Sequence, residues 1–113
     1  MSDNIHDEVK YTYHERRFTW DDRKAVINRE KHAVTFRLAE QAFADPDALG
    51  LEDHSADEER WNLIGKVQKR RRLLLFVVYV QRTLDAEGNP IYRIISARKA
   101  STREEENYYD SPG

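Results

Sequence analysis

The stretch that decides the fold is the eight-residue run Leu73-Leu74-Leu75-Phe76-Val77-Val78-Tyr79-Val80. The run is continuous and apolar, rich in residues that favour strands, and too short for a typical buried helix. It is also far shorter than the roughly 20 residues that a helix needs to cross a bilayer. We therefore predict that residues 73–80 form the central strand of a sheet in a soluble protein.

Segments on both sides of this run read as further strands. Residues 60–67 place Trp61, Leu63, Gly65 and Val67 on one side, which is typical of a strand with one buried face. A segment of turn composition, 85–90, precedes the last predicted strand at 91–98. Shorter strands are predicted at 13–20 and around 48–51.

Three helices are predicted between and after these strands. Asp21 is an N-cap for a helix that runs to about His32, and Thr35 is an N-cap for a second helix that Asp45-Pro46 stops. A third helix runs from Ser101 to about Tyr109. The order predicts an α+β domain in which a two-helix hairpin and a C-terminal helix pack on a mainly antiparallel sheet.

Length and composition limit the organisation of the chain. With 113 residues, 39% of them hydrophobic, the chain can bury one modest core, so we expect one domain over residues 13–109 between a flexible tail at 1–12 and a short tail at 110–113. It has no cysteine, which excludes a disulfide framework and a thiolate metal site. The acidic, polar start does not read as an export signal, so we expect a cytoplasmic protein.

Charge is unevenly distributed along a chain whose net charge is only −2. Residues 60–103 contain eleven Lys and Arg against two acids, while residues 45–59 contain seven acids and no Lys or Arg. If the acidic loop lies away from the basic strands, one face attracts phosphate; if it folds across them, it opposes binding.

The end of the last strand carries two adjacent cations, Arg98 and Lys99, which suit a phosphate-bearing partner. Arg60 opens another strand, and we expect the ends of these two strands to converge on one edge of an antiparallel sheet. Lys31 is a further phosphate ligand in this interpretation. Lys69 and Arg70, in the turn before the central strand, would attract a polyanion without taking part in chemistry.

A set of short motifs gives the chain a family resemblance. The set comprises Trp20-Asp21, Asn28, Lys31-His32, Val34, Phe36, Phe43-Ala44-Asp45-Pro46, Glu59-Arg60, Ile64-Gly65, the run 73–80, Arg93-Ile94-Ile95-Ser96-Ala97-Arg98, Glu104 and Tyr108. In this order the motifs resemble the BrnT family of toxins over roughly residues 18–109. The resemblance implies a RelE-like fold, an endoribonuclease that arrests translation, and a hetero-oligomer with a small DNA-binding antitoxin. One residue departs from the family, because Ala33 stands where Gly is usual; either Ala33 adopts a left-handed backbone at a cost, or the turn differs.

Cleavage of RNA without a metal or cofactor requires a proton carrier and groups that stabilise charge at the phosphate. His32 is the candidate proton carrier, since imidazoles ordinarily titrate near neutral pH. Asn28 lies four residues earlier on the same helix face, where it can orient the imidazole or contact the ribose. Alternatively, His32 only ends the helix, where a partly positive ring favours the helix dipole.

Two residues of the last helix, Glu104 and Tyr108, also share a face and complete the predicted catalytic set. Each has a structural alternative: Glu104 closes a capping box with Ser101, and Tyr108 packs against the sheet. Arg60 can likewise form a surface pair with Glu59 or the acidic loop.

We therefore expect a metal-independent endoribonuclease toxin in which Lys31, Arg60, Arg98 and Lys99 bind RNA and His32 carries protons. The competing expectation is a protein- or RNA-binding module of the same fold without catalysis. Metal chemistry is poorly supported, because the acidic loop around His54 has no recognisable ligand spacing. In the toxin interpretation the antitoxin covers part of the basic face.

Overall fold

The structure, a computed structural model, describes residues 11–13, 16–53, 59–67, 73–84 and 88–110. It contains one six-stranded sheet in the order β1-β2-β6-β5-β4-β3, in which the β2–β6 pair is parallel and the other pairs are antiparallel. The elements are β1 Tyr11–Tyr13, β2 Arg16–Thr19, α1 Asp22–His32, α2 Phe36–Ala42, β3 Leu49–Asp53, β4 Arg60–Lys66, β5 Leu74–Leu84, β6 Pro90–Lys99 and α3 Thr102–Asp110. The predicted α+β class is confirmed. None of the helices described is long and apolar enough to span a membrane.

Local capping explains why both early helices begin where the sequence predicts. The backbone N–H of Lys24 donates to Asp21 Oδ1 at 3.0 Å, and that of Leu38 donates to Thr35 Oγ1 at 3.1 Å. The strands differ more from expectation: Tyr11–Tyr13 and Arg16–Thr19 form two short paired strands in place of the single strand predicted at 13–20, and β5 continues to Leu84. The rest of the predicted N-terminal tail, residues 1–10, lies outside the described residues.

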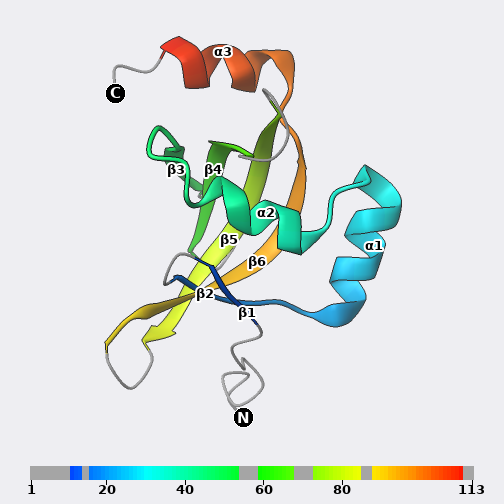
Figure 1. Ribbon diagram of the computed structural model, residues 1–113, viewed down its shortest axis with the longest axis vertical. Coiled ribbons are helices and arrows are strands. Elements are labelled where there is room, and N and C mark those ends of the chain that lie inside the picture. Colours follow the sequence, from blue (N-terminus) through cyan, green and yellow to red (C-terminus); the bar gives the residue numbers. More distant parts are fainter. Residues whose placement is uncertain (1–10, 14–15, 54–58, 68–72, 85–87, 111–113) are drawn as a thin grey trace.

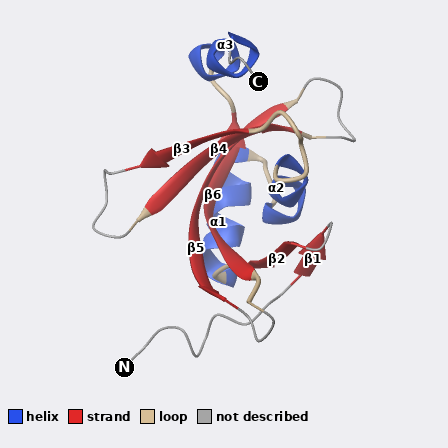
Figure 2. Cartoon of the chain, turned by 90° about the vertical axis from the view of Figure 1, so that its left-hand side faces the viewer, coloured by secondary structure: helices blue, strands red, loops and turns tan. Residues whose placement is uncertain are grey.

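Both helices of the predicted hairpin pack against the sheet, α2 on β4, β5 and β6 and α1 along β6. Figure 1 shows α2 across the sheet, with α1 to one side and α3 at the end where the C-terminus lies, and Figure 2 also shows both helices of the hairpin against the sheet. The aromatic centre of this core is Phe43, whose ring centroid lies 5.0 Å from that of Phe18 and 4.9 Å from that of Tyr79. Trp20 joins this core, whereas Trp61, also predicted to be buried, is only half-buried.

Close approach of α2 to β4 depends on Gly65. A Cβ at this position would lie 2.4 Å from the carbonyl oxygen of Ala42, a contact that only backbone movement can relieve. We expect Gly65→Ala to lower the free energy of unfolding by about 2–3 kcal/mol, measured by denaturant titration. Gly50→Ala is the matched control, because a Cβ at Gly50 meets nothing within 4 Å. Equal stability of the two variants would contradict this role for Gly65.

The turn after α1 resolves the alternatives for Ala33. Its φ of 58° and ψ of 30° are left-handed, and its backbone N–H donates to the carbonyl of Arg29. Ala33 therefore adopts the conformation that glycine accommodates without strain. We expect Ala33→Gly to raise the free energy of unfolding by about 1 kcal/mol, whereas Ala25→Gly within the right-handed helix lowers it by about the same amount. Thermal unfolding of the two variants checks the opposite signs; a loss of stability in both would rule out relief of strain at Ala33.

A buried carboxyl group on α2 makes stability depend on pH. Glu40 is 2% exposed, and burial raises its pKa to about 7, although the guanidinium of Arg37 lies 3.8 Å from its Oε2 atom. The folded protein therefore retains a proton that the unfolded chain loses near pH 4.5, and the free energy of unfolding falls as pH rises between these values. This decline in the free energy of unfolding amounts to as much as about 3 kcal/mol. We expect Glu40→Gln to remove it, as measured by denaturant titrations from pH 4.5 to 8. Glu30→Gln, on the exposed side of α1, should leave the decline in place, and an unchanged pH dependence in Glu40→Gln would contradict the assignment.

Candidate active site

Asn28 fastens α1 to the edge of β6. Its side-chain amide donates to the carbonyl of Ala97 at 2.8 Å and to that of Val34 at 3.0 Å, and its Oδ1 accepts from the N–H of Ala97 at 3.0 Å. Strand β2 pairs with β6 only as far as Thr19 and Arg93, so beyond this point the amide of Asn28 satisfies backbone groups as a neighbouring strand would. The side-chain amide of Asn28 is thus bonded to backbone groups rather than to an imidazole.

This attachment forms a pocket of about 180 Å³ between α1 and β6. It is lined by two lysines, a histidine, the Asn28 amide and three residues that supply apolar and hydroxyl surface: Lys24, Ile27, Asn28, Lys31, His32, Ile95 and Ser96. The register of β6 against β5 shifts between Val78 and Tyr79, opposite Ile95, and such irregularities commonly redirect side chains beside functional sites. The predicted pair Lys31 and His32 therefore lies in one pocket, with His32 half-buried at the end of α1.

Arg98 follows Ser96 by two residues on the same face of β6, about 7 Å farther along the strand. Its Nη1 and Nη2 atoms each donate to one carboxylate oxygen of Glu104 at 2.8 Å, and Nη1 also donates to the carbonyl of Lys99. The guanidinium carbon lies 4.3 Å from the ring centroid of Phe76. Among the described residues, the Nε–H and the adjacent Nη2–H of Arg98 remain as a second pair of parallel donors.

Glu104 also closes the predicted capping box. The N–H of Ser101 donates to Glu104 Oε1 at 2.8 Å, and the N–H of Glu104 donates to Ser101 Oγ at 3.2 Å. The hydrogen bonds from Arg98, more than those from Ser101, lower the pKa of Glu104, and the same pair raises the pKa of Arg98. The start of α3 therefore holds the Arg98 side chain in one orientation.

The family comparison agrees with this arrangement. Residues 20–104 match the family described as the ribonuclease toxin BrnT of type II toxin-antitoxin systems. The chain belongs to the BrnT family. The matched range contains α1, both walls of the pocket and the Arg98–Glu104 pair, and the sequence-based resemblance to this family is confirmed. No curated protein matches the chain.

Tyr108 lies beyond the range matched to BrnT and packs with Ile64 and Leu74 of the sheet. It is buried at 7% exposure, and its hydroxyl donates to Asp45 Oδ2 at 2.6 Å. The same carboxylate accepts from the backbone N–H of Lys66 at 2.7 Å and, through Oδ1, from that of Asp47 at 2.9 Å. Burial and the hydrogen bond to Asp45 raise the pKa of Tyr108. Asp45 thereby ties α3 to β4 and to the turn after α2.

The expected convergence of Arg60 and Arg98 is wrong. Strand β5 lies between β4 and β6 and is antiparallel to both, so β4 and β6 run in the same direction. Arg98 is level with Phe76 and Ile64, and Arg60 lies four residues before Ile64, about 13 Å away along the sheet. Arg60 instead pairs in register with Asp53 on β3.

Of the remaining predicted cations, only Lys99 is among the described residues, and it does not line the pocket. Lys99 is exposed at the end of β6, and Lys69 and Arg70 lie outside the described residues. Four residues that line the pocket were missed from sequence, the polar Lys24 and Ser96 and the apolar Ile27 and Ile95. Lys24 precedes Asn28 by four residues and Lys31 by seven, a spacing that places all three on one helix face, so the signal was present. Ser96 carries no such signal, because its position depends on the irregularity in β6.

Proposed function

We propose that this chain is a metal-independent endoribonuclease toxin that cleaves RNA and arrests translation in the cytoplasm. In this proposal the ribose 2′-OH attacks the adjacent phosphate, the 5′ oxygen leaves, and a cognate DNA-binding antitoxin neutralises the activity. Membership of a ribonuclease toxin family supports the general class of activity. The pocket between α1 and β6 supports the more detailed mechanism.

The single observation that carries the proposal is the presence of His32, Lys31 and Lys24 in one pocket. An imidazole can remove a proton from the 2′-OH or return one to the leaving oxygen. Two ammonium groups stabilise the charge that develops on the phosphate during attack. The substrate supplies its own nucleophile, so these side chains provide the remaining functions that the reaction needs.

Arg98 is proposed to bind a second phosphate of the RNA rather than the one that is cleaved. Its two remaining donors are parallel and match a phosphate, while Glu104 and Phe76 hold the guanidinium in place. Such preorganisation reduces the entropy lost on binding.

The test is cleavage of a short RNA in excess EDTA, compared with the same RNA carrying a single 2′-deoxy substitution at the cleaved position. We expect cutting of the RNA, a 2′,3′-cyclic phosphate on the product, and no cutting at the deoxy position. Cutting at the deoxy position would overturn 2′-OH attack, and dependence on added metal would overturn metal independence. Intact RNA with well-folded protein would favour the non-catalytic binding module.

A further inference from the structure

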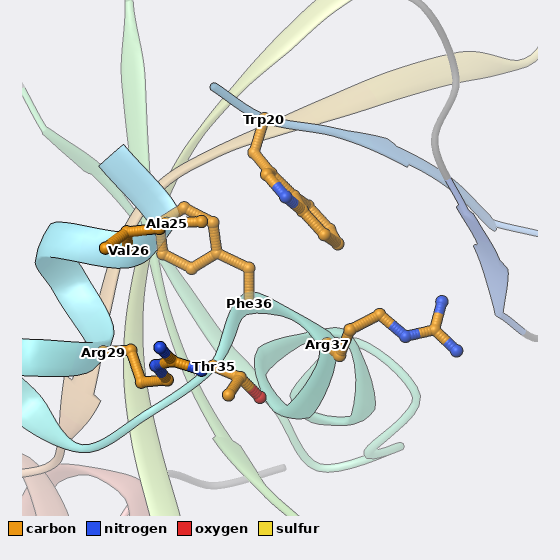
Figure 3. A pocket seen from close by; sticks show the side chains of 7 residues that line it. All are labelled: Trp20, Ala25, Val26, Arg29, Thr35, Phe36 and Arg37. Atoms are coloured by element: carbon orange, nitrogen blue, oxygen red, sulfur yellow. The ribbon is translucent and has the colours of Figure 1, made fainter. Parts of the chain in front are cut away.

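A second cavity lies on the other side of α1, between α1 and α2. Its volume is about 170 Å³, and Trp20 and Phe36 line its interior. Figure 3 shows Val26 and Arg29 of α1 on one side of this cavity and Arg37 of α2 on the opposite side. We call it the α1–α2 cavity.

The α1–α2 cavity uses a helix surface that the candidate active site does not. Ala25, Val26 and Arg29 line it, whereas Lys24, Ile27 and Lys31 line the pocket at β6. At 100° per residue these two sets lie on opposite sides of α1. Val26 lines this cavity and is 48% exposed, so its apolar surface is accessible to a partner.

Size and chemistry define what the α1–α2 cavity can accept. Its volume is below the roughly 300–1,000 Å³ of typical small-molecule sites, so it suits a single inserted side chain. Trp20 and Phe36 are only 6% and 2% exposed as residues, and their rings contact each other edge to face, so neither ring offers an open face for a nucleobase to stack on. An aliphatic side chain packs against such a surface without needing an open ring face.

The charge at the rim of the cavity determines which residues can flank the inserted side chain in the partner. Arg29 is exposed, and the Arg37 side chain is 57% exposed despite its 3.8 Å ion pair with Glu40. Guanidinium groups on opposite sides of an apolar cavity complement carboxylates that flank an apolar anchor. Arginine is also one of the residue types that contribute most of the binding energy at protein interfaces.

We propose that the α1–α2 cavity docks an acidic, amphipathic segment of the antitoxin, with one aliphatic side chain in the cavity and carboxylates against Arg29 and Arg37. The inference rests on the proposed function, in which an antitoxin neutralises this chain. Val26 precedes His32 by six residues, about 9 Å along the helix. Because the pocket at β6 lies on the other side of α1, a protein anchored in the cavity covers that pocket by extending around the helix.

The experiment measures the affinity of the full chain for the antitoxin encoded in the adjacent reading frame. Val26→Asp and Arg29→Glu, each tested alone, should weaken binding by about tenfold or more, because they place negative charge at the rim. Leu51→Asp and Arg103→Glu are matched controls, since they make the same changes at exposed positions on β3 and α3, and they should change affinity by no more than about twofold. Circular dichroism confirms that each variant is folded.

Unchanged affinity in both cavity variants would overturn the proposal. A loss of RNA binding by Arg29→Glu with full affinity for the antitoxin would also overturn it and assign the cavity to nucleic acid. RNA cleavage by the variants without antitoxin should equal that of the wild type, because neither residue lines the pocket at β6. If the wild type cleaves no RNA but the cavity variants still lose antitoxin binding, the docking site stands and the ribonuclease proposal fails.

Discussion

Replacement of His32 with alanine is expected to reduce RNA cleavage by about 10²–10⁴-fold, the usual contribution of a general acid or base. His32 is the histidine that lies beside Lys31 and Ser96 in the pocket between α1 and β6. Loss of the imidazole removes the proposed proton carrier and leaves the lysines in place. The rate of the cleavage step, measured in single turnover with enzyme in excess, reports this effect directly.

A pH series separates a chemical role for His32 from a structural one. If His32 transfers a proton in the cleavage step, His32→Ala should lose the pH dependence of the wild-type rate as well as the rate itself. His54→Ala is the matched control, because His54 is not part of the motifs that resemble the BrnT family. A decrease of less than about tenfold in folded His32→Ala, with the pH dependence intact, would exclude His32 as the proton carrier.

Features that depend on a few neighbouring residues were predicted well. The starts of α1 and α2 follow from the side chains of Asp21 and Thr35, which accept hydrogen bonds from backbone groups three residues later. The capping box of Ser101 and Glu104 is equally local. These interactions form wherever the helix forms, so the sequence alone contains the information.

Features that depend on strand order were not predictable in the same way. Whether Arg60 lies beside Arg98 depends on the strand between them: β5 is antiparallel to both β4 and β6, so these two strands run in the same direction and the two arginines lie at opposite ends. The hydrophobic pattern within a strand predicts which face of that strand is buried. It does not predict the direction of a strand that lies two places away in the sheet. The hydrogen bond between Tyr108 and Asp45 joins residues 63 positions apart, and no local pattern reports it.

The candidate active site also has one part that was predictable from sequence and one part that was not. Lys24, Asn28 and Lys31 share a helix face by spacing alone, so the lysine-rich wall of the pocket was accessible from sequence. The other wall, Ile95 and Ser96, is brought there by β6 and its irregular register. Whether Asn28 faced a ligand or the backbone could not be decided until β6 was placed beside it.

Removal of the Asn28 amide is expected to have the largest effect on stability. Asn28→Ala leaves the N–H and carbonyl of Ala97 and the carbonyl of Val34 without their side-chain partner in a region where Asn28 itself is only 6% exposed. A buried polar group without a partner costs about 1–3 kcal/mol, so we expect the free energy of unfolding to fall by about 4 kcal/mol. Guanidinium titrations followed by tryptophan fluorescence measure this change.

Two further variants show whether the hydrogen bonds themselves account for that loss. Asn107→Ala, on the exposed side of α3, should change stability by no more than about 0.5 kcal/mol. Asn28→Asp keeps the acceptor for the N–H of Ala97 but directs a carboxylate at two carbonyl oxygens, so it should be as unstable as Asn28→Ala at pH 7. Protonation at low pH restores one donor, and the aspartate variant should then recover part of its stability relative to the alanine variant. Stability within about 1 kcal/mol of the wild type in Asn28→Ala would mean that packing, rather than this amide, holds α1 and its Lys31–His32 pair against β6.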